Sequence, residues 1–196
     1  MLLHLIALGA NSPQGLAANL RRVARAGRAL PGRVVAASRP WRSPAWPPGR
    51  SQPDFVNAVA LVCSPLPPEA MLVRLHGIER RAGRVRGDRW AVRPLDLDLL
   101  ATGALVRPDP QKVRAWVALG PEAQARWTPD RLLLPHPRLQ HRGFVLLPLR
   151  EIAPDWRHPL TGRTAHGMAK ALPLRQRAGM RALSPGPALV KRRRRA

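Results

Sequence analysis

The chain has 196 residues and is 45% hydrophobic, which is enough for one buried core, so we expect a single domain over residues 1–172 and a disordered basic tail over residues 173–196. Its 34 lysines and arginines against 11 acidic residues give a formal net charge of +23, which favours polyanions without choosing among nucleotides, nucleic acid or acidic membranes. The single cysteine, Cys63, excludes disulfides within the chain and a cysteine metal cluster.

The sequence predicts a cytoplasmic protein, which we expect to be a monomer. No apolar run approaches the roughly 18 residues of a membrane span. The apolar segment 2–8 also lacks the basic start and the small-residue cleavage site of a secretion signal.

The first predicted elements are a strand and a helix. The apolar run 2–8 is typical of a buried strand that ends at Gly9-Ala10-Asn11. From Leu16 to Leu30, apolar residues recur every three or four positions with arginines on the other face, until Pro31-Gly32 stops the pattern. This spacing predicts an amphipathic helix.

Two further strands are predicted at residues 34–37 and 55–62, because both segments are rich in residues that favour strands. Between them, residues 40–53 form a long loop of proline, glycine and tryptophan. Loops of this length in a compact domain are often functional, so this one is a candidate substrate loop.

A second helix and a fourth strand follow. Apolar positions predict a helix over residues 68–82, with Gly83 as its C-terminal cap. Residues 94–100 alternate apolar and acidic side chains, which predicts a strand with one wet face. The resulting order of strand, helix, two strands, helix and strand indicates an α+β fold, a ferredoxin-like sandwich with a mainly antiparallel sheet. The apolar segments 132–134 and 144–149 have no assigned element.

Asp96 and Asp98 are the first candidates for chemistry. Two residues apart on a strand, their carboxylates project from the same face about 7 Å apart along the backbone. Paired carboxylates suit Mg²⁺, which takes one or two of them together with water and phosphate oxygens. The alternative is a strand whose acidic face meets solvent, and spacing alone favours that alternative.

A cluster of arginines directly precedes the acidic strand. Phosphoryl transfer needs both cations that orient phosphate oxygens and a metal site, and the two adjoin here in sequence. Taken by itself, the cluster is more typical of a solvated basic loop than of a phosphate site. No GxxxxGK[ST] loop and no GxGxxG segment is present, so a phosphate site in this chain has to be built from side chains. The arginines are Arg84, Arg86, Arg89 and Arg93.

Several unusual segments occur together in one order. They are ALGAN at 7–11, QPDFVNAV at 52–59, IERRAGRVR at 78–86, RPLDLDLL at 93–100, LPHPRL at 134–139 and RGFVLLPLREIAP at 142–154. Through these segments the chain resembles the 6-hydroxymethyl-7,8-dihydropterin pyrophosphokinases, from near its first residue to about Gly162. The resemblance implies transfer of the terminal diphosphate of ATP to a pterin alcohol in folate biosynthesis, with release of AMP.

The resemblance also assigns roles to individual residues. Asp96 and Asp98 would hold two Mg²⁺ ions, and Arg84 and Arg93 would stabilise charge in the transition state. Residues expected to bind ATP are Glu79, Arg84, Arg86, Trp90, Arg93, His136 and Arg142. Residues expected around the pterin are Ser43, Pro44, Trp46, Phe55, Asn57 and Phe144, with the two phenylalanines on either side of the ring.

Three features depart from the family pattern. Ala91-Val92 stands where Gly-Pro is common, Ser12-Pro13 replaces Leu-Gly, and residues 110–128 have no counterpart in the shortest relatives.

Two rival readings concern function. One is a small basic RNA-binding module, because ferredoxin-like sheets often bind RNA through exposed aromatic residues. The absence of tyrosine, the lack of an aromatic pattern on the strands and the acid pair all argue against nucleic acid. The other is a family member that has lost its activity, which the retained acids and arginines oppose.

Overall fold

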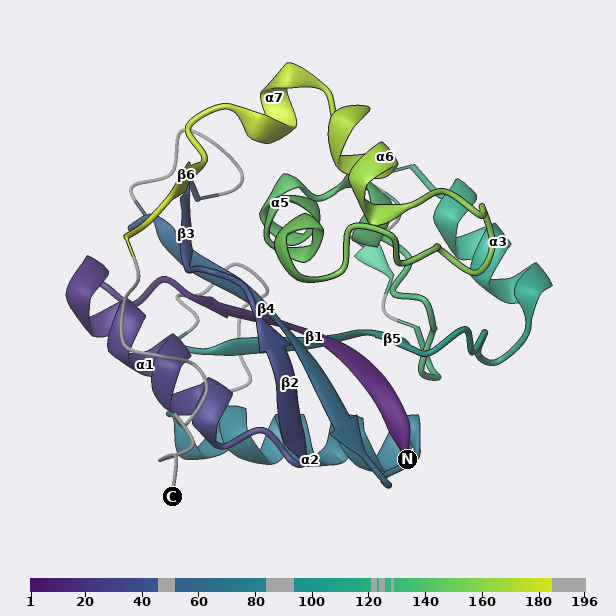
Figure 1. Ribbon diagram of the computed structural model, residues 1–196, viewed down its shortest axis with the longest axis horizontal. Helices are drawn as coiled ribbons and strands as arrows, with labels where there is room; N and C mark the ends of the chain where they lie inside the picture. Colours follow the sequence, from purple (N-terminus) through teal and green to yellow (C-terminus); the bar gives the residue numbers. More distant parts are fainter. Residues whose placement is uncertain (46–51, 84–93, 121–122, 124–125, 128, 185–196) are drawn as a thin grey trace.

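The computed structural model in Figure 1 describes residues 1–45, 52–83, 94–120, 123, 126, 127 and 129–184. Its elements, in chain order, are β1 Leu2–Ala10, α1 Leu16–Arg28, β2 Arg33–Ala37, β3 Trp41–Ser43, β4 Phe55–Ser64, α2 Pro68–Arg81, β5 Asp96–Thr102, α3 Pro110–Ala118, the 3₁₀ helix η1 Leu139–His141, α5 Gly143–Ile152, α6 Ala165–Lys170, α7 Leu174–Arg177 and β6 Arg181–Ala182.

The strands form one antiparallel sheet. In the order β5-β1-β4-β3-β6, β1 lies between β5 and β4, and β2 and β3 pair with successive parts of the same edge of β4. If β2 and β3 are taken together as one broken strand, the order is that of a ferredoxin-like sheet. The predicted fold class is therefore confirmed.

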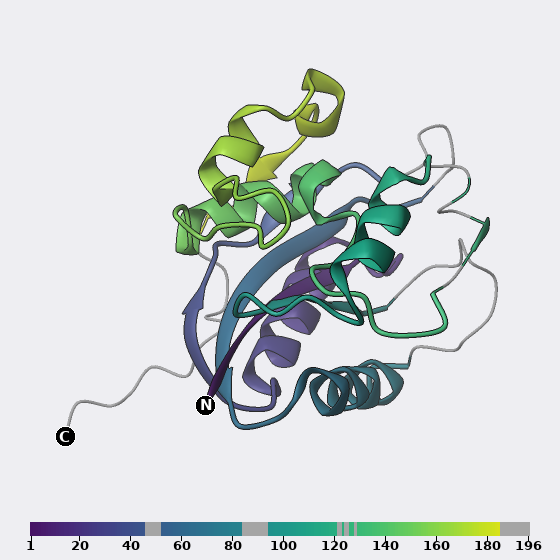
Figure 2. The same ribbon diagram turned by 90° about the vertical axis from the view of Figure 1, so that its right-hand side faces the viewer.

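Helices cover the sheet on both faces, as Figures 1 and 2 show from two directions. Helices α1 and α2 pack on one face, where Ile6, Leu8 and Leu97 belong to a buried core with residues of both helices. Helices α5 and α6 pack over part of the other face, where Leu5 and Val59 belong to a second core. Because strand side chains alternate, each central strand contributes to both cores.

The predicted helices form for the reasons that the sequence indicates. The stripe Met71, Leu75 and Ile78 of α2 is buried against the first core. Gly83 follows the helix with a φ of +86°, and its amide donates to the Arg80 carbonyl, as expected of a glycine cap. In α1 the buried amide of Asn19 exchanges two hydrogen bonds with the Ser12 backbone, and so ties the end of β1 to the helix.

Three segments differ from the expectation or extend it. The predicted loop 40–53 contains β3, which pairs with β4 over Trp41–Ser43. The extra stretch 110–128 begins with α3, whose first turn is capped by the Asp109 side chain. Residues 173–184 of the predicted tail form α7 and β6, while residues 185–196 lie outside the described residues. The domain boundary itself stays a prediction.

No helix within the described ranges combines the length and the apolar character needed to cross a membrane.

Candidate active site

The two acids of β5 lie on the sheet face that α5 partly covers. Leu97 and Leu99 point into the core beneath α1 and α2, so the alternating residues Asp96 and Asp98 point to the opposite face. Both acids are half-buried. The acids therefore share one face, as their spacing predicts.

A row of residues crosses the sheet beside Asp96. In the strand register, Gly9 of β1 lies opposite Asp96 on one side and opposite Asn57 of β4 on the other. A Cβ atom built on Gly9 would lie 3.4 Å from Asn57 Oδ1, 3.8 Å from the Phe55 ring and 3.9 Å from the Asp96 Cβ. The missing side chain at Gly9 leaves a space that these three residues border.

Asn57 is held in place from β3. It is 5% exposed, and its side-chain Nδ2 donates to the Ser43 hydroxyl at 2.9 Å. Ser43 pairs with Phe55 in the ladder between β3 and β4. Three of the residues predicted to surround the pterin are thus brought together by strand pairing, and Pro44 follows directly in the chain.

Arg142, the residue before α5, connects Asp98 to Phe144. Its Nη1 donates to Asp98 Oδ2 at 3.1 Å, and its guanidinium carbon lies 5.4 Å from the centre of the Phe144 ring. The side chains of Arg142 and Asp98 are 21% and 32% exposed, so water screens this ion pair only partly. The arrangement thus brings together Asp98, predicted to bind metal, Arg142, predicted to bind ATP, and Phe144, predicted to bind the pterin.

His136 lies near this pair. Its backbone amide donates to the Leu100 carbonyl in β5, and its Nδ1 accepts from the Arg138 amide at 3.1 Å. Burial and the charge of Arg142 lower the pKa of His136 to about 4, against the opposite effect of Asp98. The ring is therefore neutral at pH 7, and because Nδ1 accepts, its proton is on Nε2.

Glu79, predicted to bind ATP, contacts the backbone of the acidic strand. It is 3% exposed in α2, and its Oε1 accepts from the Leu97 amide at 2.7 Å. Because β5 is the first strand in the sheet order, this carboxylate satisfies a backbone donor at the sheet edge. The observed contact makes Glu79 a support for the acidic strand.

The other predicted site residues fall outside the described part of the chain. They are Trp46, Arg84, Arg86, Arg89, Trp90 and Arg93.

Gly9 borders the candidate site, and the sequence did not identify it. Its signal was its place two residues after Ala7 on the same strand, so that the last two residues on this face of β1 are small. Small residues on a strand between two strands with polar side chains leave room for a ligand, but the pairing has to be known before this can be seen.

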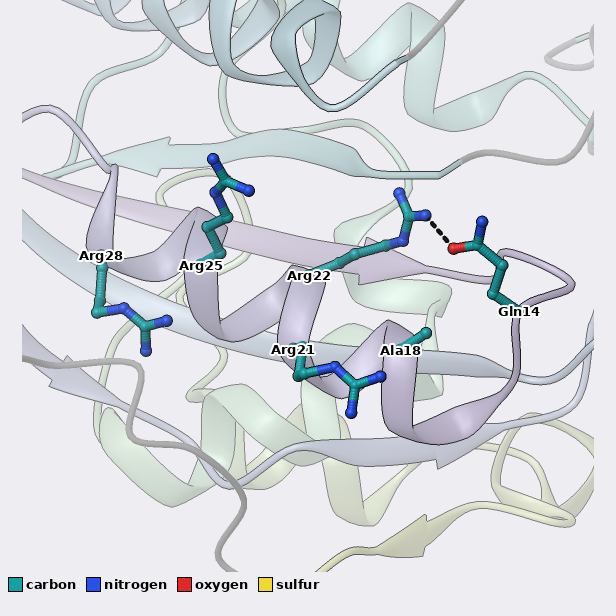
Figure 3. A pocket seen from close by; sticks show the side chains of 6 residues that line it. All are labelled: Gln14, Ala18, Arg21, Arg22, Arg25 and Arg28. Carbon is teal, nitrogen blue, oxygen red and sulfur yellow. Dashed lines mark hydrogen bonds between the residues drawn. The ribbon is translucent and has the colours of Figure 1, made fainter.

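A separate arginine-lined groove lies on the outer side of α1 (Figure 3). Its volume is about 530 Å³, and Arg22 donates to the Gln14 side chain there. Because α1 packs on the sheet face away from Asp96 and Asp98, this groove is not part of the acid site. The residues that line it are Gln14, Ala18, Arg21, Arg22, Arg25 and Arg28.

The geometry defines a class of protein: a ferredoxin-like α+β domain with two acids, a buried amide and a phenylalanine on one sheet face, and a second phenylalanine on the helix that partly covers that face. Residues 5–154 match the sequence model of the 7,8-dihydro-6-hydroxymethylpterin-pyrophosphokinase (HPPK) family. The chain belongs to this family.

Individual relatives agree with this assignment. The chain is 40% identical over 116 residues to a 2-amino-4-hydroxy-6-hydroxymethyldihydropteridine pyrophosphokinase of Synechocystis, a match that covers 59% of this chain and 49% of the relative. It is 39% identical over 130 residues to a protein of the same name in Methylorubrum extorquens, covering 65% and 68% of the two chains. The matched region thus spans about half of the Synechocystis relative.

Solved structures support the fold. Wild-type HPPK-DHPS of Plasmodium falciparum superposes with a TM-score of 0.58 at 14% identity, over 86% of this chain and 44% of that one. At this identity the likeness supports the fold alone.

Proposed function

We propose that this chain transfers the terminal diphosphate of ATP to the hydroxymethyl group of 6-hydroxymethyl-7,8-dihydropterin, in folate biosynthesis. Membership of the HPPK family and the names of the relatives support this activity. The observation that carries the proposal is the shared sheet face of Asp96, Asp98, Asn57 and Phe55, with Arg142 bound to Asp98. We also propose that the chain acts as a monomer in the cytoplasm.

The pterin would lie over the row formed by Asp96, Gly9 and Asn57. A flat heteroaromatic ring needs aromatic faces for stacking, which Phe55 and Phe144 can supply, and paired donors and acceptors at its edge, which the Asn57 amide can supply. Its Nδ2 already donates to Ser43, so its Oδ1, which faces the space at Gly9, is oriented as an acceptor.

The acid pair fits a magnesium site. Magnesium takes one or two protein carboxylates and completes its octahedron with water and phosphate oxygens, so Asp96 and Asp98 are sufficient without a third protein ligand. Within the described residues, no group of three or more His, Cys, Asp and Glu side chains that could hold a metal ion occurs. We propose that Asp96 and Asp98 would hold two Mg²⁺ ions, which would neutralise charge on the phosphates of ATP.

The protein groups around the acids orient the phosphates. Arg142 offers charged donors beside Asp98, and neutral His136 offers its Nε2 proton as a donor. We further propose that Arg84 and Arg93 stabilise the charge that develops in transfer, and that Arg86, Trp90 and Trp46 complete the ATP and pterin contacts.

In the proposed reaction the pterin hydroxyl oxygen forms a bond to the β-phosphorus of ATP. The bond from that phosphorus to the oxygen bridging the α- and β-phosphates breaks, AMP departs with that oxygen, and the hydroxyl proton passes to water. Positioning and charge neutralisation supply most of the acceleration in such transfers.

The test is the formation of AMP from ATP, Mg²⁺ and the pterin alcohol, measured by chromatography. We expect Asp98→Asn to lower kcat/KM by about 10²–10³-fold, the range for loss of one electrostatic group at a reacting centre. Asp130→Asn, at a side chain that is 91% exposed, is the matched control and should keep full activity. An Asp98→Asn variant that forms AMP at the wild-type rate would refute the proposal.

A further inference from the structure

The C-terminal part of the described chain returns to the site after the family match has ended. The match ends at residue 154, whereas α7 and β6 form from residues 174–182. In Figure 1, β6 lies beside β3 and α7 lies near α5, so one short segment reaches two of the three elements that carry proposed pterin contacts. We call residues 173–184 the return segment.

The first contact of the return segment is with β3. Arg181 and Ala182 pair with Arg42 and Trp41, and the Leu183 amide donates to the Pro40 carbonyl at 2.9 Å. The three-residue β3 therefore lies between β4 and β6. An isolated pair of such short strands is marginal in water, so the second neighbour adds order to β3.

A second contact lies just beyond β3, where Gly179 meets Pro44. Gly179 has a φ of +71°, a region that side chains other than glycine rarely adopt. A Cβ atom at this position would lie 2.7 Å from the Pro44 Cγ, closer than packed carbons approach. The fit between Gly179 and Pro44 thus requires glycine for both backbone and steric reasons.

The third contact is with the first turn of α5. A Cβ atom on Gly143 would overlap the backbone oxygen of Gln176 and would lie 3.1 Å from the Met180 sulfur. Gly143 stands between Arg142, which binds Asp98, and Phe144. The return segment therefore packs directly on the backbone that carries these two side chains.

We infer that the return segment is a positioning element for the pterin end of the site. It fixes Ser43 and Pro44 through β3 on one side and Phe144 through the first turn of α5 on the other. Holding both sides before the substrate arrives removes the ordering cost from binding, which raises affinity without adding a contact to the substrate. This inference rests on the proposed function, because it assumes that these residues bind a pterin.

Gly179→Ala tests the contact with Pro44, and Gly162→Ala is its matched control. Gly162 has a similar φ of +68°, but a Cβ atom there would meet nothing within 4 Å, so both variants share the backbone strain and only the first disturbs Pro44. We expect Gly179→Ala to raise the Kd of the pterin alcohol about tenfold by calorimetry. The Kd of a non-hydrolysable ATP analogue should stay within twofold, and Gly162→Ala should change neither constant.

Gly143→Ala tests the contact with Gln176, and Gly77→Ala is its control. Gly77 is also helical, and a Cβ atom there would meet only the ends of two arginine side chains, at 3.6 Å or more. We expect Gly143→Ala to raise the pterin Kd at least tenfold and to speed amide exchange in β3 and β6, because displacement of Gln176 loosens the return segment. Gly77→Ala should leave the Kd unchanged.

The outcomes separate the inference from the proposed function. A wild-type chain that binds no pterin alcohol overturns both. Wild-type pterin binding that is unchanged in Gly179→Ala and Gly143→Ala, while amide exchange in β3 quickens, overturns the inference alone and leaves the return segment with only a structural role.

Discussion

Gly9 allows the location of the pterin to be tested with a substitution that should not harm the fold. A glycine inside a strand lowers the free energy of unfolding by about 0.5–1 kcal/mol relative to alanine, because glycine loses more backbone conformational freedom on folding. The Cβ atom of Gly9→Ala would meet its nearest neighbour, Asn57 Oδ1, at 3.4 Å, which is an ordinary contact. We therefore expect the free energy of unfolding to rise by up to about 1 kcal/mol.

Binding should change in the opposite direction, because the new atoms occupy the space between Asn57, Phe55 and Asp96. Forcing extra methyl groups into a filled site costs about 1–3 kcal/mol, which corresponds to a loss of roughly 5- to 150-fold in affinity. Gly9→Ala should lie near the lower end of this range and Gly9→Val near the upper end.

Urea unfolding gives the stability of each variant, and calorimetry gives the Kd of the pterin alcohol. The two variants control for each other, since both remove the glycine and differ only in side-chain volume. If Gly9→Val folds as stably as the wild type and binds pterin with the wild-type Kd, the ring does not lie over this row, and the proposed placement is refuted.

Three other predictions concern the surroundings of the site. Glu79→Ala leaves the Leu97 amide of β5 without its acceptor and should lower the free energy of unfolding, measured in urea, by about 1–3 kcal/mol. Glu79→Gln should lower it less, and equal decreases in the two variants would contradict this role. Burial lowers the pKa of His4 below 6.5, so the unfolded chain binds this proton more readily and stability falls as the pH drops below about 6.5. His4→Gln should flatten that fall in urea titrations at pH 5 and 7.5, and an unchanged fall would contradict this reasoning. Replacing Arg21 and Arg25 together with glutamine should leave the KM values for ATP and pterin within twofold, since α1 covers the opposite sheet face, and a tenfold change would contradict that arrangement.

The main elements were predictable because their patterns are local. The helical stripe that ends at Gly83 and the alternation around Asp96 and Asp98 each extend over enough residues to reveal their period. In β1 the observed strand ends at Ala10, within the predicted Gly9-Ala10-Asn11 end, and pairing with β4 and β5 keeps Gly9 in the strand beyond the apolar run 2–8. The register between paired strands determines where a strand ends, and the sequence of one strand does not reveal that register.

The short strands could not be predicted for a physical reason. A strand of three residues, such as Trp41–Ser43, is too short to show a period, and prolines on both sides suggest a loop. Its conformation depends on distant partners: β4, β6, and Glu151, which accepts from the Trp41 indole nitrogen at 3.1 Å. Trp41 and Glu151 are 110 positions apart in the sequence, and the partners of β3 in β6 are farther away still.

Helix α5 was unassigned for a different reason. Its segment is almost wholly apolar and contains Pro148, so periodicity could not separate a buried helix from a buried strand. Five successive residues of this helix, 145–149, are buried, which matches a helix enclosed by the sheet, α6 and α7. An enclosed helix has no polar face to mark its period.

The candidate site was predictable only in part, because the resemblance indicated which residues belong to it but not which residues they contact. The sequence could not show that Glu79 supports β5 at Leu97, the residue between the two acids. A strand at the sheet edge can shift or fray, and two like charges on one face add repulsion that favours such movement. A buried carboxylate that binds the intervening amide opposes this movement from the sheet edge, while Arg142 compensates the charge of Asp98 on the face that α5 partly covers. The spacing of the acids therefore depends on a residue that need not touch the substrate, and substitutions at Glu79 should alter metal affinity together with stability.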